Sequence, residues 1–219
     1  MIKLIIFDAG DILYDWHYWS KYFGKRFQKL LKTHGVKDIE NEGKLWDRVA
    51  VDANTGKISL QEAHGRHLVN LGLSKNLVAE YEKLDREALA KLKVKDTKTR
   101  EILTELKARG YKIAILSDTP HSKSTKNWII KNIGLGELFD AIFVSSEIGH
   151  MKPDKEAYFT VLNSFKIKPT EAVFVGHDED ELVGAKKIGM KTISYLGHHS
   201  GDFVIKKFSE ILDVVISLR

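Results

Sequence analysis

The chain has 219 residues, of which 43% are apolar and 30% are charged. This composition is ordinary for a folded globular protein and argues against extensive disorder. The length exceeds that of one minimal domain but falls short of two full ones, so we expect one large core with an inserted subdomain.

Charge, cysteine content and hydropathy restrict the classes of function. The net charge of +5 could steer anions to a site, but the lysines are spread out, so we expect no nucleic-acid partner. The absence of cysteine removes disulfides, thiolate metal sites and cysteine nucleophiles, and favours a cytoplasmic location. The apolar start of the chain ends at Asp8, too early for a secretory signal or a membrane span. We expect a monomer or a homodimer without a membrane partner.

Five short apolar or β-branched runs predict strands. They cover residues 3–7, 112–116, 141–144, 172–175 and 191–195. Runs that are apolar almost without interruption are typical of strands buried on both faces, as in a parallel sheet.

Helical patterns separate these strands from residue 97 onward. One covers residues 97–109, a second follows Pro153, a third follows Asp180, and a last one carries Phe208 and Ile211. Alternation of strands and helices predicts an α/β fold with a Rossmann-like, doubly wound parallel sheet.

The segment from the first strand to residue 92 is far longer than a strand–helix connection requires. Four helical patterns fill it, at residues 18–34, 41–53, 60–71 and 75–92. We therefore divide the chain into a core of residues 1–14 and 93–219 and an inserted helical subdomain of residues 15–92. Four aromatic residues at its start either form the subdomain's own core or line a substrate pocket: Trp16, Tyr18, Trp19 and Phe23.

Polar side chains follow four of the predicted strands. They are Asp8, Ser117 with Asp118, Lys152, and the acidic run that begins at Asp178. In an open α/β sheet the carboxyl ends of the strands meet at the ligand site. A carboxylate can act as a nucleophile, while hydroxyl and ammonium groups and an Mg²⁺ ion on acidic ligands neutralise phosphate. The sequence therefore predicts a hydrolase that attacks a small phosphorylated metabolite.

The same four segments, in this order and spacing, resemble the four motifs of the haloacid dehalogenase (HAD) superfamily, and the insertion resembles the helical cap of its phosphoglycolate-phosphatase-like members. The resemblance implies a divalent-metal-dependent phosphatase that forms an aspartyl-phosphate on Asp8. It implies three catalytic residues, which are Asp8, Ser117 and Lys152. It assigns substrate binding to Ser117, Asp118 and Lys152, and binding of Mg²⁺ to Asp8, Gly10 and Asp178.

Two positions depart from the family pattern. Gly10 stands where family phosphatases usually have a second aspartate that serves as general acid and base. Asp11 could replace that acid or could simply stabilise a local turn. His177 stands where a metal-binding aspartate is expected, so Asp178 could take that role, or His177 could itself bind an ion softer than Mg²⁺.

Three functions remain open at this point. The first is the phosphatase. The second is a 2-haloacid dehalogenase, which Ala9 and Gly10 favour and which Asp118 opposes, since that branch has asparagine there. The third is a non-catalytic binding protein, which Gly10 and His177 favour. Four other histidines show no metal-ligand spacing and are expected at the surface or in turns: His121, His150, His198 and His199.

Overall fold

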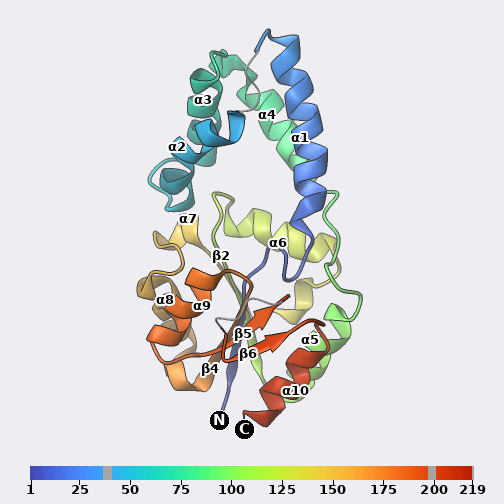
Figure 1. The fold of residues 1–219 in the computed structure, drawn as a ribbon, viewed down its shortest axis with the longest axis vertical. Coiled ribbons are helices and arrows are strands. Elements are labelled where there is room, and N and C mark those ends of the chain that lie inside the picture. The colour runs from blue at the N-terminus through green and yellow to red at the C-terminus, as the bar shows by residue number, and fades with distance from the viewer. Residues whose placement is uncertain (37–40, 197–200, 219) are drawn as a thin grey trace.

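A computed structural model describes residues 1–36, 41–196 and 201–218 of the chain. Six parallel strands form one sheet in the order β3-β2-β1-β4-β5-β6 (Figure 1). The strands are β1 (Leu4–Phe7), β2 (Lys112–Ser117), β3 (Ala141–Val144), β4 (Ala172–Gly176), β5 (Lys191–Tyr195) and β6 (Phe203–Ile205). The predicted α/β sheet is confirmed, and β6 is a strand that the sequence did not predict.

Strand β1 lies in the middle of the sheet, and all four of its residues are fully buried. Ile5 and Phe7 point into the apolar cluster on one face, and Leu4 and Ile6 point into the cluster on the other. Both faces are covered by helices, which is why this strand is apolar without alternation.

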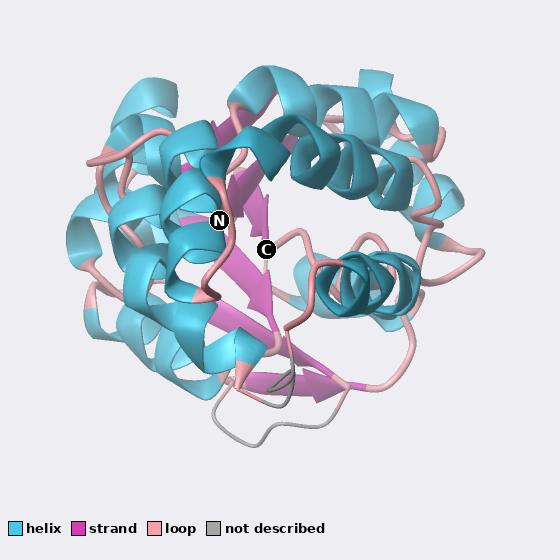
Figure 2. Ribbon diagram, turned by 90° about the horizontal axis from the view of Figure 1, so that it is seen from above, coloured by secondary structure: helices cyan, strands magenta, loops and turns pink. Residues whose placement is uncertain are grey.

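Helices lie on both sides of the sheet, as the view from above shows (Figure 2). On the face of Phe7 pack α5 (Thr99–Ala108), α6 (Lys123–Asn132) and α10 (Glu210–Ser217), and on the other face pack α8 (Lys155–Phe165) and α9 (Glu179–Lys187). The short helix α7 (Ser145–Ile148) follows β3. The sequence did not predict α6 or α7. None of the helices described is long and apolar enough to cross a bilayer.

Four helices stand together above the sheet in Figure 1. They are α1 (Trp16–Thr33), α2 (Glu42–Asn54), α3 (Leu60–Asn70) and α4 (Val78–Leu89), with a 3₁₀ turn at Lys75–Leu77. Their own apolar cluster includes Phe23, Phe27, Leu68 and Tyr81. We propose that these helices form the inserted cap, with its boundaries at residues 15 and 92.

The two chain segments that join the cap to the sheet are bonded to each other. The amide of Asp15 donates to the carbonyl of Lys93 at 3.0 Å, and the amide of Lys95 donates to the carbonyl of Leu13 at 3.0 Å. The ammonium of Lys95 also contacts Asp11 at 3.2 Å and Asp15 at 3.4 Å. These contacts fix where α1 leaves the sheet, and Asp15 caps that helix by accepting from the amide of His17.

The strand order reverses at β1, because β2 and β3 lie on one side of it and β4, β5 and β6 on the other. Such a switch point opens a crevice at the carboxyl ends of the strands, where ligands of α/β proteins bind. Asp8 follows β1 at this point, and His177 follows β4.

Candidate active site

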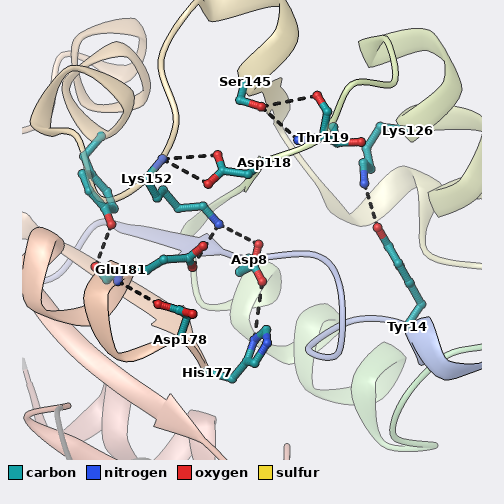
Figure 3. A network of polar contacts seen from close by, with 11 residues as sticks. Asp8, Tyr14, Asp118, Thr119, Lys126, Ser145, Lys152, His177, Asp178 and Glu181 are labelled. Atoms are coloured by element: carbon teal, nitrogen blue, oxygen red, sulfur yellow. Dashed lines mark hydrogen bonds and ion pairs between the residues drawn. The ribbon is translucent and has the colours of Figure 1, made fainter. Parts of the chain in front are cut away.

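Asp8 is held in place by contacts from two other parts of the chain. Its amide donates to the carbonyl of Val175 at 2.9 Å, and its Oδ1 accepts from Nζ of Lys152 at 2.7 Å (Figure 3). Its Oδ2 lies 3.6 Å from Nδ1 of His177. The carboxylate is largely buried but lines the cavity beneath the cap. The structure therefore brings the predicted nucleophile and the predicted lysine together.

The fully buried ammonium of Lys152 donates hydrogen bonds to two carboxylates, because it also contacts Oε2 of Glu181 at 3.1 Å. Burial by itself would lower the pKa of Lys152, but the surrounding carboxylates outweigh it and raise the pKa well above its ordinary value. Lys152 thus stays protonated and fixes the orientation of Asp8.

Ser117 is the last residue of β2 and Asp118 follows it, and both line the same cavity as Asp8. The carboxylate of Asp118 accepts from the amide of Lys152 at 3.1 Å, so it anchors the loop that carries the lysine. Burial, only partly offset by Lys152, raises the pKa of Asp118. Their predicted roles toward a substrate stay predictions.

The acidic loop after β4 is arranged differently from the sequence-based expectation for Asp178. The Asp178 carboxylate accepts from the amides of Asp180 and Glu181 and caps helix α9. Glu181 instead reaches the cavity beside Lys152 and Asp8. Burial raises the pKa of Glu181 to about 8, and the nearby carboxylates add to the effect.

The side chains around Asp8 were compared with the ligands that a divalent cation would need. Nδ1 of His177 is buried and has no hydrogen-bond partner, and it faces Oδ2 of Asp8. Among the side chains described, no group of three or more His, Asp or Glu residues is arranged to hold a metal ion. The side chains that face each other beside the nucleophile are thus Asp8 and His177, while Asp178 caps α9, and the predicted binding of Mg²⁺ by Asp8, Gly10 and Asp178 stays a prediction.

Gly10 and Asp11 show where the missing general acid would stand. A Cβ atom at Gly10 would meet nothing within 4 Å, so a larger side chain has room there. Asp11 lies in the left-handed region with φ of 56°, and its Oδ1 accepts from the amide of Trp16 and from Lys95. Asp11 is thus engaged in the turn that leads into the cap.

The cavity between sheet and cap has a volume of about 650 Å³, within the range of small-molecule sites. One side of the helix α1 contributes a row of stacked rings. Trp16 and Trp19 lie 4.8 Å apart, and Trp19 and Phe23 lie 4.6 Å apart, between ring centroids. These three residues line the cavity, whereas Tyr18 packs against the core cluster.

The expectation of a surface position is wrong for His121, which is buried at the boundary of sheet and cap. Its Nε2 lies 3.6 Å from Oδ2 of Asp85, a cap residue that also accepts from Nε1 of Trp19 at 2.7 Å. Burial lowers the pKa of His121 to about 3, so this contact is not an ion pair at neutral pH. His150 is exposed, and His198 and His199 lie outside the described residues.

Many of the residues that line the cavity were not predicted from the sequence, among them Tyr14, His64, Asp85 and Lys126. None of these four lies in a motif, and their common location depends on how α3, α4 and α6 approach the end of β1. Had α6 been predicted as a helix, the burial of Lys126 could have been expected, because it lies on the same helix as the buried Ile129 and Ile130.

Comparisons with known proteins agree with this architecture. The family model of haloacid dehalogenase-like hydrolases matches residues 2–189. Pyrophosphatase PpaX of Bacillus thuringiensis is 30% identical over 128 residues, which are 54% of this chain and 58% of that protein. The match thus spans less than two thirds of that relative.

Solved structures match over nearly the whole chain. A 2-haloacid dehalogenase from Pseudomonas syringae pv. Tomato has a TM-score of 0.76 at 18% identity, with 100% of both chains covered. A predicted phosphoglycolate phosphatase from Haemophilus somnus has a TM-score of 0.71 at 16% identity, with 98% of both chains covered. At these identities the likeness concerns the fold. The chain belongs to the haloacid dehalogenase-like hydrolase family.

Proposed function

We propose that the protein is a phosphatase of a small phosphorylated metabolite and that Asp8 is its nucleophile. The observation that carries this proposal is the 2.7 Å contact between Oδ1 of Asp8 and Nζ of Lys152 at the edge of the cap-covered cavity. The lysine holds one carboxylate oxygen, and the other carboxylate oxygen is left to attack.

In the proposed reaction, Oδ2 of Asp8 bonds to the phosphorus while the bond from phosphorus to the leaving oxygen breaks. Water then attacks the phosphorus of the aspartyl-phosphate, which releases phosphate and restores the carboxylate. In this proposal Ser117, which lines the cavity, donates to a phosphoryl oxygen, and Lys152 keeps Asp8 oriented through both steps.

The leaving group receives no help from residue 10, because glycine has no acid to donate. General acid–base catalysis contributes roughly 10²- to 10⁴-fold to such steps. We therefore expect esters with good leaving groups, such as acyl or aryl phosphates, to react faster than alkyl phosphates.

We further propose dependence on a divalent cation held by Asp8, Gly10 and His177. Three carboxyl groups surround the single ammonium of Lys152, and when they are ionised they leave excess negative charge beside the place of an anionic substrate. A bound cation would supply the charge neutralisation that phosphoryl transfer requires. The unpartnered nitrogen of His177 favours an ion softer than Mg²⁺.

A screen of metal ions against phosphate esters tests the proposal. Purified protein is assayed with Mg²⁺, Mn²⁺, Co²⁺, Ni²⁺ and Zn²⁺ on alkyl, aryl and acyl phosphates, with Asp8→Asn as the inactive control. Phosphate release that requires a cation and disappears in Asp8→Asn is expected. Release that persists in Asp8→Asn contradicts the role of Asp8.

A dehalogenase is the second candidate, because residue 10 is glycine and no three-ligand group is arranged for a metal in the described part of the chain. Chloride release from 2-chloropropionate in the presence of EDTA would support it. Ligand binding without phosphate or chloride release would instead support the non-catalytic alternative.

A further inference from the structure

Lys126 is, besides Lys152, a second buried lysine, and the reaction proposed above does not use it. Lys126 is only 2% exposed, lies in helix α6 and lines the wall of the cavity. Its Nζ donates to the hydroxyl of Tyr14 at 2.7 Å and lies 5.3 Å from the centre of that ring. Tyr14 is itself buried and lines the cavity.

The two buried lysines have different partners. Lys152 contacts the carboxylates of Asp8 and Glu181, whereas no carboxylate of the described residues lies within 4.0 Å of Lys126. A buried ammonium without an anionic partner is unfavourable. In line with this, burial lowers the pKa of Lys126 to about 8, and the more distant carboxylates of Asp8 and Asp118 offset burial only in part. An anion that enters the cavity would supply the missing partner.

Lys126 is also the only lysine or arginine among the described residues that line the cavity. Several carboxyl groups line it as well, and those that are ionised repel an anionic ligand: Asp8, Asp11, Glu42, Asp85, Asp118 and Glu181. The Lys126 ammonium has donors left after its bond to Tyr14, since an ammonium has three.

The position of the pair relative to Asp8 indicates which part of a substrate it would meet. Figure 3 shows Lys126 and Tyr14 across from Lys152 and Glu181, with the Asp8 carboxylate between the two groups. In the proposed reaction the transferred phosphoryl group sits at Asp8 beside Lys152, which leaves Lys126 and Tyr14 to the remaining part of the substrate. We propose that Lys126 and Tyr14 form a second anion-binding subsite, which receives a carboxylate or phosphate on the leaving group. This inference rests on the proposed function and narrows its substrate class to compounds with two anionic groups.

Matched pairs of substrates test the subsite. Carboxyalkyl phosphates of increasing chain length are compared with the hydroxyalkyl phosphates of the same length, and kcat/KM is measured for each. Wild-type protein should prefer the carboxylate member of the best pair by roughly 10- to 100-fold. Lys126→Met should bring this ratio close to one, and Lys126→Arg should retain much of it. Lys123→Met, an exposed lysine of the same helix, should leave the ratio unchanged.

Tyr14→Phe provides a second variant that keeps the ring and removes the hydroxyl. It should reduce the ratio by about threefold to tenfold, the equivalent of one hydrogen bond. Thermal unfolding confirms that each variant is folded. If Lys126→Met does not fold, Lys126→Arg and Tyr14→Phe decide the question.

Binding measured without turnover separates this inference from the proposed function. Isothermal titration calorimetry of the same pairs on Asp8→Asn protein, with and without Lys126→Met, gives the preference independently of catalysis. If no ester is hydrolysed but the carboxylate preference is present and depends on Lys126, the subsite stands and the phosphatase proposal fails. A wild-type preference below about twofold, or one that survives Lys126→Met, overturns the subsite.

Discussion

The two sides of the cavity differ in charge. On the sheet side, Asp8, Asp118 and Glu181 surround the ammonium of Lys152. On the cap side, stacked rings of α1 and the imidazole of His64 line the cavity, and burial lowers the pKa of that histidine to about 3, so it is neutral. The sheet side thus holds a buried cluster of carboxylates around one ammonium, whereas the cap presents stacked rings, a neutral histidine and the separate carboxyl groups of Glu42 and Asp85.

This difference suggests a division of roles, in which the sheet side carries out the reaction and the cap side selects the substrate. The sheet-side groups are held by strand ends and by short hydrogen bonds, so they are positioned before any ligand arrives. The cap-side groups are joined to the sheet through the paired segments around Asp15 and Lys95 and through the contact of Asp85 with His121. Substitutions on the two sides should therefore have effects of different kinds.

The largest effects are expected from Lys152→Met. It leaves buried carboxylates without their cation, which should destabilise the protein by about 3–5 kcal/mol and lower activity by at least about 10²-fold. Lys126→Met removes a buried ammonium whose partner is a neutral phenol, so it should leave stability unchanged or raise it. Urea unfolding of both variants at neutral pH makes the comparison, with the exposed Lys155→Met as control. Equal loss of stability in both would contradict the distinction between the two lysines.

Gly10→Asp should have the next largest effect, as a gain. It restores a carboxyl acid in a position with free space, so turnover of alkyl phosphates should rise by roughly tenfold to a hundredfold. Aryl phosphates, whose leaving groups need little protonation, should gain much less. Gly10→Asn is the control of the same size without an acid. Equal gains from both variants would show that proton donation is not the cause.

Asp85→Asn tests the cap side and should have the smallest effect. Burial raises the pKa of Asp85 from 3.8 to about 6, and Trp19 only partly offsets this. Because the unfolded chain releases this proton first, wild-type stability falls as the pH rises from about 4 to about 6 and stays lower above that. The variant should therefore match wild type at pH 4 and be more stable by up to about 3 kcal/mol at pH 8.

Urea unfolding at the two pH values measures this difference. Asparagine can still accept from Nε1 of Trp19, so the hydrogen bond is kept. A variant that is less stable than wild type at pH 8 would show that ionised Asp85 is stabilised in the folded protein, in contradiction to the account.

The fold could be predicted from sequence where burial alone determines the pattern. Strand β1 is apolar throughout because it is covered on both faces, and that signal needs no knowledge of its neighbours. Helix α6 has no comparable signal, since only Trp128, Ile129 and Ile130 interrupt a polar sequence. Strand β6 has three residues, too few to show a periodicity.

The site could be predicted where a residue follows a strand, as Asp8 and Lys152 illustrate. Where several acidic residues are adjacent in the sequence, it could not be predicted which of them reaches the site. Asp178 and Glu181 are equally acidic in the sequence, but the helix start uses the first as its cap and turns the second toward Lys152. The burial of His121 depends on Asp85, which comes from the cap and is distant in sequence.

Trapping of the covalent intermediate tests the central role of Asp8 most directly. Protein mixed with a reactive phosphate ester is quenched in acid within one turnover, reduced with borohydride and analysed by peptide mass spectrometry. The account predicts that residue 8 is found as homoserine, the reduction product of an aspartyl-phosphate, and that Asp8→Asn yields none. Phosphate release with residue 8 unmodified throughout the first turnover would contradict it.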